Sequence, residues 1–123
     1  MAEDLIRSSR EGIRESEFFF ALSTVNYVRS IRNPADEDHH LIIDQIAYAK
    51  SLGKPAAILL EVSLTSEDEK IVREALEGMD IMGVFKFESG NEESIKSAVI
   101  KMRKAIDKIM CARIRLEDER DMK

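Results

Sequence analysis

The sequence predicts an α/β fold in which a small parallel sheet of about three strands lies between two layers of helices. The first observation is that short apolar runs alternate with longer amphipathic segments along the chain. The second is the length of 123 residues, which is typical of one domain. The third is a composition of 44% apolar and 35% charged residues, which supports one core and excludes a disordered chain. Because helices separate the strands, we expect crossover connections, a doubly wound three-layer sandwich and the order α-β-α-β-α-β-α.

The first third of the chain predicts a helix, a strand and a loop. Residues 3–16 carry apolar side chains at about every fourth position, which indicates a helix with one narrow apolar face. Residues 18–22 form an uninterrupted apolar run, which is typical of a strand buried on both faces. We expect residues 23–27 to form a polar turn and residues 28–38 a loop, because Pro34 disfavours helix in the residue before it.

The middle of the chain predicts a helix, a second strand and a further helix. Apolar positions over residues 41–52 repeat with a helical period, and Gly53 is the expected end of that helix. Residues 56–62 form the second apolar strand. Ser66 and Glu69 match a capping box, so we expect Ser66 to be the N-cap of the helix that follows.

The last third predicts a strand and a long helix. Residues 81–87 form the third strand, and Asn91 is the expected N-cap of a helix whose apolar stripe includes Met102 and Ile106. Cys111 lies near this stripe, so we expect a buried structural thiol. A single cysteine cannot form an internal disulfide, and the absence of a signal peptide then favours a cytoplasmic protein. We expect one domain over residues 1–116 and a polar tail over residues 117–123.

Charge is distributed unevenly along the chain. Residues 1–95 hold 10 basic and 19 acidic side chains, whereas residues 96–123 hold 9 basic and 5 acidic ones. The acidic body and an aromatic content of 6% argue against nucleic acid as a partner. No apolar run is long enough to cross a bilayer, so we expect no membrane partner. A small sheet with exposed edges favours a homo-oligomer or a partner protein instead.

Several motifs follow one another in the first half of the chain, namely Ile13–Glu17, Phe18–Leu22, Ser23–Tyr27 with Ser30, Gln45–Ala49, Gly53–Pro55 and Ala56–Val62. In their order and spacing, these segments resemble the core of TIR-like domains and of the related nucleoside 2-deoxyribosyltransferase-like proteins. This resemblance implies a flavodoxin- or TIR-like fold and a site for NAD or a nucleoside. It also implies that Ser23, Asn26, Tyr27 and Ser30 are the residues that line that site.

Two departures from the family pattern bear on catalysis. The functional glutamate of these enzymes falls on Gln45, whose neutral amide can neither act as a nucleophile nor stabilise an oxocarbenium-like centre. Asp44 is adjacent but points about 100° away on a helix, so it substitutes only after a small shift of register. Glu37 is the other candidate carboxylate. The family also begins with a strand, a helix and a strand that have no counterpart here, so we expect part of the pocket to be missing unless another chain supplies it.

Residues 36–40 form an acidic run that ends in two histidines. Carboxylates and imidazoles bind divalent metals, but contiguous side chains rarely converge on one ion. His39 and His40 are therefore weak metal candidates, and we expect this loop mainly to place negative charge at the start of the next helix.

Taken together, the sequence favours a non-catalytic, TIR-like interaction or signalling module that acts by self-association or partner docking, without a cofactor. The first alternative is a nucleoside- or NAD-processing N-glycosidic hydrolase or transferase that uses Asp44 or Glu37. The second alternative is a metal-binding regulatory domain built on His39 and His40.

Overall fold

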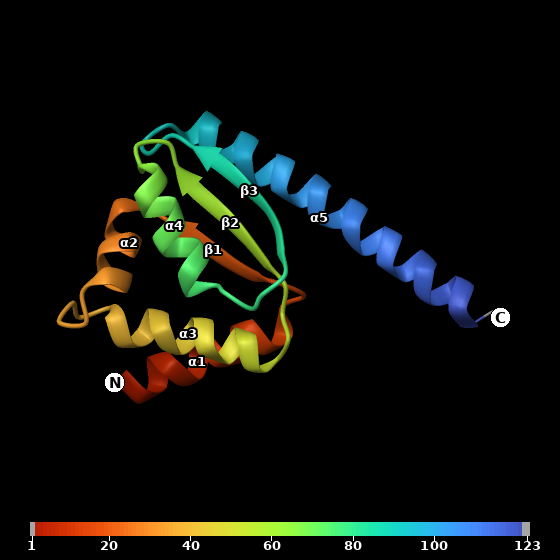
Figure 1. The fold of residues 1–123 in the computed structure, drawn as a ribbon, viewed down its shortest axis with the longest axis horizontal. Helices are drawn as coiled ribbons and strands as arrows, with labels where there is room; N and C mark the ends of the chain where they lie inside the picture. Colours follow the sequence, from red (N-terminus) through yellow and green to blue (C-terminus); the bar gives the residue numbers. More distant parts are fainter. Residues whose placement is uncertain (1, 122–123) are drawn as a thin grey trace.

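The computed structural model describes the backbone of residues 2–121 and the side chains of residues 6–113. The elements follow in the order α1 (Ala2–Glu15), β1 (Phe19–Ser23), α2 (Val25–Arg32), α3 (His39–Ser51), β2 (Ala56–Glu61), α4 (Ser66–Ala75), β3 (Ile81–Phe87) and α5 (Glu92–Asp121). The three strands form one all-parallel sheet in the order β1-β2-β3, with helices on both faces (Figure 1). The predicted three-layer α/β architecture is therefore confirmed.

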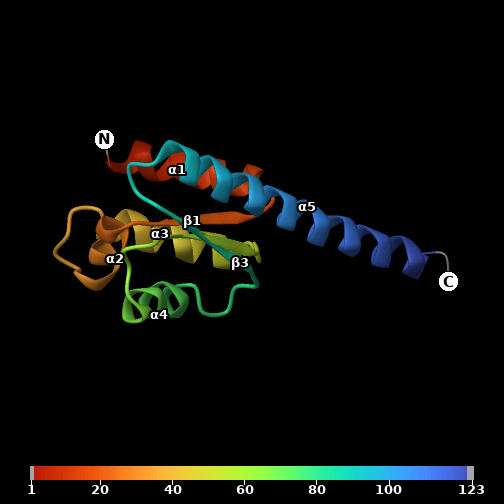
Figure 2. The same cartoon turned by 90° about the horizontal axis from the view of Figure 1, so that it is seen from above.

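The sheet separates two hydrophobic cores. Helices α2, α3 and α4 cover one face, and α5 runs across the other (Figure 2). Successive side chains of a strand point to opposite faces, so Ile58 of β2 packs beneath α3 and α4 whereas Leu59 packs beneath α5. Both are at most 1% exposed, because the central strand is covered on both sides. This double burial explains the uninterrupted apolar run in the sequence.

The pairing of β1 with β2 is regular from Phe19 opposite Ala56 to Ser23 opposite Leu60. The pairing of β2 with β3 contains one irregularity, between Ala56 and Ala57. Both β1 and β3 are edge strands, because β2 lies between them.

One expected loop contains a helix, so the observed order has one more helix than predicted. The segment Val25–Arg32 forms α2, and Thr24 is its N-cap, with a hydroxyl that accepts a hydrogen bond from the Tyr27 N–H at 3.2 Å. Pro34 restrains only its own predecessor, Asn33, which is the C-cap of this helix. The proline therefore marks where the helix ends and does not prevent it.

The start of α4 also differs from the prediction by one residue. Thr65 is the N-cap, and it exchanges hydrogen bonds of 3.2 and 3.0 Å with the N–H and carboxylate of Asp68. Ser66 with Glu69 has the same spacing as Thr65 with Asp68, so the sequence pattern fits both registers. The backbone of Thr65 is extended, whereas Ser66 already lies in the first turn.

The final helix projects beyond the sheet (Figures 1 and 2). Its 30 residues rise about 45 Å, whereas the 7 residues of β3 span only about 23 Å. Cys111 lies past the residues that cover the sheet and is exposed, so the expectation of a buried thiol was wrong. The expected polar tail is helical as far as Asp121, and residues 122 and 123 lie outside the described part. Within residues 2–121, no helix combines the length and apolarity needed to cross a bilayer.

Candidate functional site

At the carboxyl end of β1, polar groups of the protein form hydrogen bonds with one another. Ser23 is fully buried, and its hydroxyl donates a hydrogen bond to the Ala21 carbonyl at 3.4 Å. The Val25 N–H, in the first turn of α2, donates to the Glu61 carboxylate at the end of β2, at 3.2 Å. A carboxylate thus already lies at the positive end of α2, where an anionic ligand would otherwise be stabilised.

The other residues that the resemblance assigns to a ligand site point in different directions from α2. Asn26 is exposed, whereas Ser30 is buried and donates a hydrogen bond to the Asp36 carboxylate at 2.9 Å. The Tyr27 hydroxyl is buried and has no hydrogen-bond partner among the described residues. Burial raises the pKa of this phenol to about 12. Of these four residues, Asn26 is exposed, Tyr27 is partly buried, and Ser23 and Ser30 are buried.

The acidic loop before α3 is held together by Asp36. Its carboxylate accepts hydrogen bonds from the Asp38 N–H at 3.0 Å and from the Ser30 hydroxyl. These two bonds, first that of Asp38 and then that of Ser30, hold the pKa of Asp36 below its usual value. Glu37 is exposed beside this network and accepts none of these bonds. Asp36 therefore has a structural role, and Glu37 is left at the surface.

His39 and His40 are neighbours at the start of α3, and His39 contacts the preceding helix. The Nδ1 atom of His39 lies 2.7 Å from the Ser30 carbonyl oxygen, which can only accept, so Nδ1 carries the proton. The rings of His39 and His40 meet edge to face, with centroids 5.5 Å apart. Among the side chains that the structure describes, no three His, Cys, Asp or Glu groups are placed to hold one ion.

The side chains of Asp44 and Gln45 line two different surface depressions. The Asp44 carboxylate accepts two hydrogen bonds from Arg10 of α1, at 2.6 and 3.1 Å. The bond from Arg10 holds the pKa of Asp44 below its usual value. Gln45 lines a separate groove of about 360 Å³ beside β1, together with Gly12 and Phe20. Neighbouring positions on a helix diverge by about 100°, which explains why the two side chains share no site.

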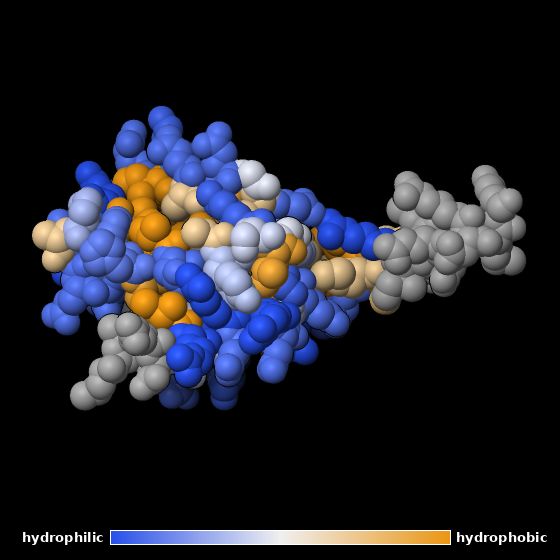
Figure 3. Space-filling model, turned by 90° about the horizontal axis from the view of Figure 1, so that it is seen from below, coloured by the Kyte–Doolittle hydropathy of each residue, from blue (hydrophilic) through white to orange (hydrophobic). Residues whose placement is uncertain are grey.

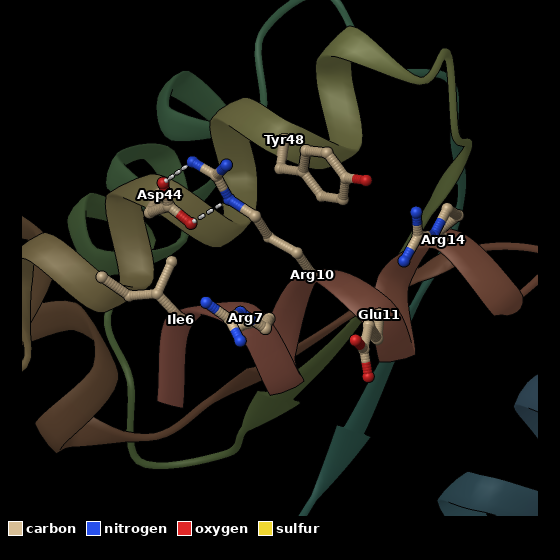
Figure 4. Close-up of a pocket in the computed structure, with 7 residues that line it drawn as sticks. All are labelled: Ile6, Arg7, Arg10, Glu11, Arg14, Asp44 and Tyr48. Carbon is tan, nitrogen blue, oxygen red and sulfur yellow. Dashed lines mark hydrogen bonds and ion pairs between the residues drawn. The ribbon is translucent and has the colours of Figure 1, made fainter. Parts of the chain in front are cut away.

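A cavity of about 430 Å³ lies between α1 and α3 (Figure 4). Arg7, Arg10 and Arg14 reach it from one face of α1, and Asp44 and Tyr48 reach it from α3. The guanidinium carbon of Arg10 lies 5.2 Å from the centre of the Tyr48 ring, so a cation–π contact and an ion pair both hold Arg10. Sequence reasoning missed this cavity, although the i, i+3, i+7 spacing of the arginines places them on one helix face.

Within residues 2–121, part of β1 is not covered by any helix on one face of the sheet. Phe20 and Leu22 point to the face of the sheet on which α5 packs, but α5 covers β2 and β3, and these side chains remain 38% and 45% exposed. The Phe19 N–H donates to the Pro55 carbonyl at 2.8 Å, on the side of β2. Peptide groups alternate along a parallel strand, so those of Phe20 and Leu22 point outward, away from β2.

No protein-family model, curated protein or solved structure matches the chain. The resemblance to TIR-like domains therefore stays a prediction from the sequence.

Proposed function

We propose that the protein is a non-catalytic interaction module, TIR-like in the order of its elements, that acts through the outer edge of β1. Self-association is the form of this proposal that we develop, and docking of a partner protein to the same edge is its other form. The observation that carries it is that Phe20 and Leu22 present exposed apolar side chains and outward peptide groups at one sheet edge.

Such an edge favours association for two reasons. Unpaired N–H and C=O groups along an edge strand can accept a further strand, which adds main-chain hydrogen bonds. Burial of a fully exposed Phe or Leu side chain contributes roughly 1.5–3 kcal/mol. Since Phe20 and Leu22 are a little under half exposed, burial of what remains contributes about 1 kcal/mol each.

The surroundings of β1 fit this proposal. The groove of about 360 Å³ beside β1 is lined on the side of α1 by Ser9, Gly12 and Ser16, which have small side chains and leave room along the edge. No hydrogen bond within the described residues reaches the outward peptide groups of Phe20 and Leu22.

The placement of the candidate carboxylates also favours binding over catalysis. Asp44 is paired with Arg10 and lies in the cavity between α1 and α3, whereas Ser23 is buried at the end of β1. Gln45, at the position of the family's glutamate, has no charge to offer an oxocarbenium-like centre.

Light scattering after size-exclusion chromatography, over protein concentrations of about 1 to 100 µM, tests the proposal. The test variant is Phe20→Lys with Leu22→Lys. The matched control is Ile43→Lys with Ile100→Lys, because Ile43 and Ile100 are similarly exposed, at 39% and 54%, but lie on helices. We expect the wild type and the control to associate as concentration rises and the test variant to stay monomeric. A monomeric wild type, or equal association of all three proteins, would contradict self-association.

A further inference from the structure

The cavity between α1 and α3 has an unusual concentration of positive charge. Three arginines reach it from α1, against the two carboxylates of Glu11 and Asp44, in a protein whose formal net charge is −5. Like charges three and four residues apart on a helix repel one another, and the single carboxylate of Glu11, which is spaced to attract both Arg7 and Arg14, offsets only part of this repulsion. A counter-charge from outside the chain would relieve that repulsion.

Among the side chains of residues 6–113, only Arg10 has a carboxylate partner within this cavity. Its guanidinium uses Nε and one terminal nitrogen to bind Asp44, and its central carbon lies over the Tyr48 ring. Among the described residues, no carboxylate forms an ion pair with Arg7 or Arg14. Figure 4 shows these two guanidinium groups on either side of Arg10, with the Tyr48 hydroxyl on the side of Arg14.

The carbonyl groups at the C-terminal end of α1 are bound by a lysine. The Lys54 ammonium donates hydrogen bonds to the carbonyl oxygens of Arg14 and Ser16, at 3.2 and 2.5 Å. These carbonyls carry the partial negative charge of the helix end, and the ammonium compensates it. The positive potential of the arginines is thereby preserved next to Arg14.

We propose that this cavity binds an oxoanion, and that its preferred ligand is the phosphate group of a small phosphate ester. Guanidinium groups bind phosphate through paired N–H donors, and Arg7 and Arg14 supply those donors from either side of the fixed Arg10. A volume of about 430 Å³ lies within the usual range for small-molecule sites. The surrounding face is largely hydrophilic, with several apolar patches between the polar side chains, as Figure 3 shows for the side on which α1 and α3 lie. This favours a small polar ligand over a broad apolar one.

The proposal is independent of the association through β1, because the cavity contains neither Phe20 nor Leu22. Isothermal titration calorimetry of the full chain at low ionic strength tests it, with pyrophosphate, adenosine monophosphate and acetate as separate probes. The test variant is Arg7→Gln with Arg14→Gln. It leaves the bond from Arg10 to Asp44 in place, and circular dichroism verifies its fold.

The matched control is Arg29→Gln with Arg32→Gln, which removes the same charge from a different depression, between α2 and α4. We expect one saturable site for the two phosphate probes, an affinity at least about tenfold lower in the test variant, and less than a twofold change in the control. Acetate should bind far more weakly, since it offers fewer acceptors and less charge.

Three results would overturn the proposal. The first is no saturable heat with either phosphate probe up to about 10 mM. The second is an equal loss of affinity in the test and control variants, because binding would then reflect net charge alone. The third is equal binding of acetate and phosphate, which would exclude a phosphate-selective site.

Discussion

Replacement of Tyr27 by Phe removes a hydroxyl that is buried without a partner among the described residues. A buried polar group that lacks a hydrogen bond destabilises the folded state by roughly 1–3 kcal/mol, whereas the ring keeps its packing after the change. We therefore expect Tyr27→Phe to be neutral or to raise the free energy of unfolding by about 1 kcal/mol. Urea denaturation followed by circular dichroism measures this difference. A loss of more than about 1 kcal/mol would show that the hydroxyl has a partner, and would return Tyr27 to the group of candidate ligand-binding residues.

The same burial predicts how Tyr27 titrates. Its folded pKa is raised from about 10 to about 12, so the folded protein keeps the proton where the unfolded chain has lost it. Stability is consequently lost as pH rises through the window from about 10 to about 12. The chain has two tyrosines and no tryptophan, so phenolate absorbance in a Tyr48→Phe variant reports Tyr27 alone. A midpoint near 10 in a protein that is still folded would refute the burial of this hydroxyl.

Three further predictions concern the helix caps, the ion pair between α1 and α3, and the cysteine. Thr65→Ala should destabilise the protein by about 1 kcal/mol, whereas Ser66→Ala should have almost no effect in the same urea titration; equal effects would contradict Thr65 as the N-cap. Asp44→Asn removes a carboxylate whose pKa is lowered by Arg10, so the wild type should be the more stable protein above about pH 4 and should lose that advantage as pH falls below this value. A difference that persists unchanged at low pH would exclude the ion pair as its cause. Cys111 is exposed, so it should react with a thiol reagent in the folded state as fast as in denaturant, and a protected thiol would contradict its placement.

The fold could be predicted largely because each strand of this chain leaves a simple pattern. Ile58 and its neighbours are buried on both faces and therefore form an uninterrupted apolar run. Helix α2 was missed because its eight residues are mostly polar on the outside and lie directly before a proline. It contacts the core through Tyr27, Val28 and Ile31, which span little more than one helical turn and are too few for a clear periodic signal.

The candidate sites were harder to predict, because they depend on which elements meet. Asp44 and Gln45 are adjacent in sequence, yet one faces Arg10 and the other faces the groove beside β1. Nothing in the sequence reveals that α1 packs along α3 and brings Arg10 to Tyr48. The exposure of Phe20 and Leu22 likewise follows from where α5 crosses the sheet, since in sequence they belong to a run that resembles a fully buried strand.

Amide hydrogen exchange at β1 is the sharpest test of association through this edge, because it reports on the outward peptide groups themselves. The Ala21 N–H points toward β2 and should be protected at every protein concentration, whereas the N–H groups of Phe20 and Leu22 should exchange rapidly in dilute solution. We expect the N–H groups of Phe20 and Leu22 to become protected as concentration rises and the protein associates. Rapid exchange at these two residues in a sample that light scattering shows to be fully associated would contradict the assignment of β1 as the interaction edge.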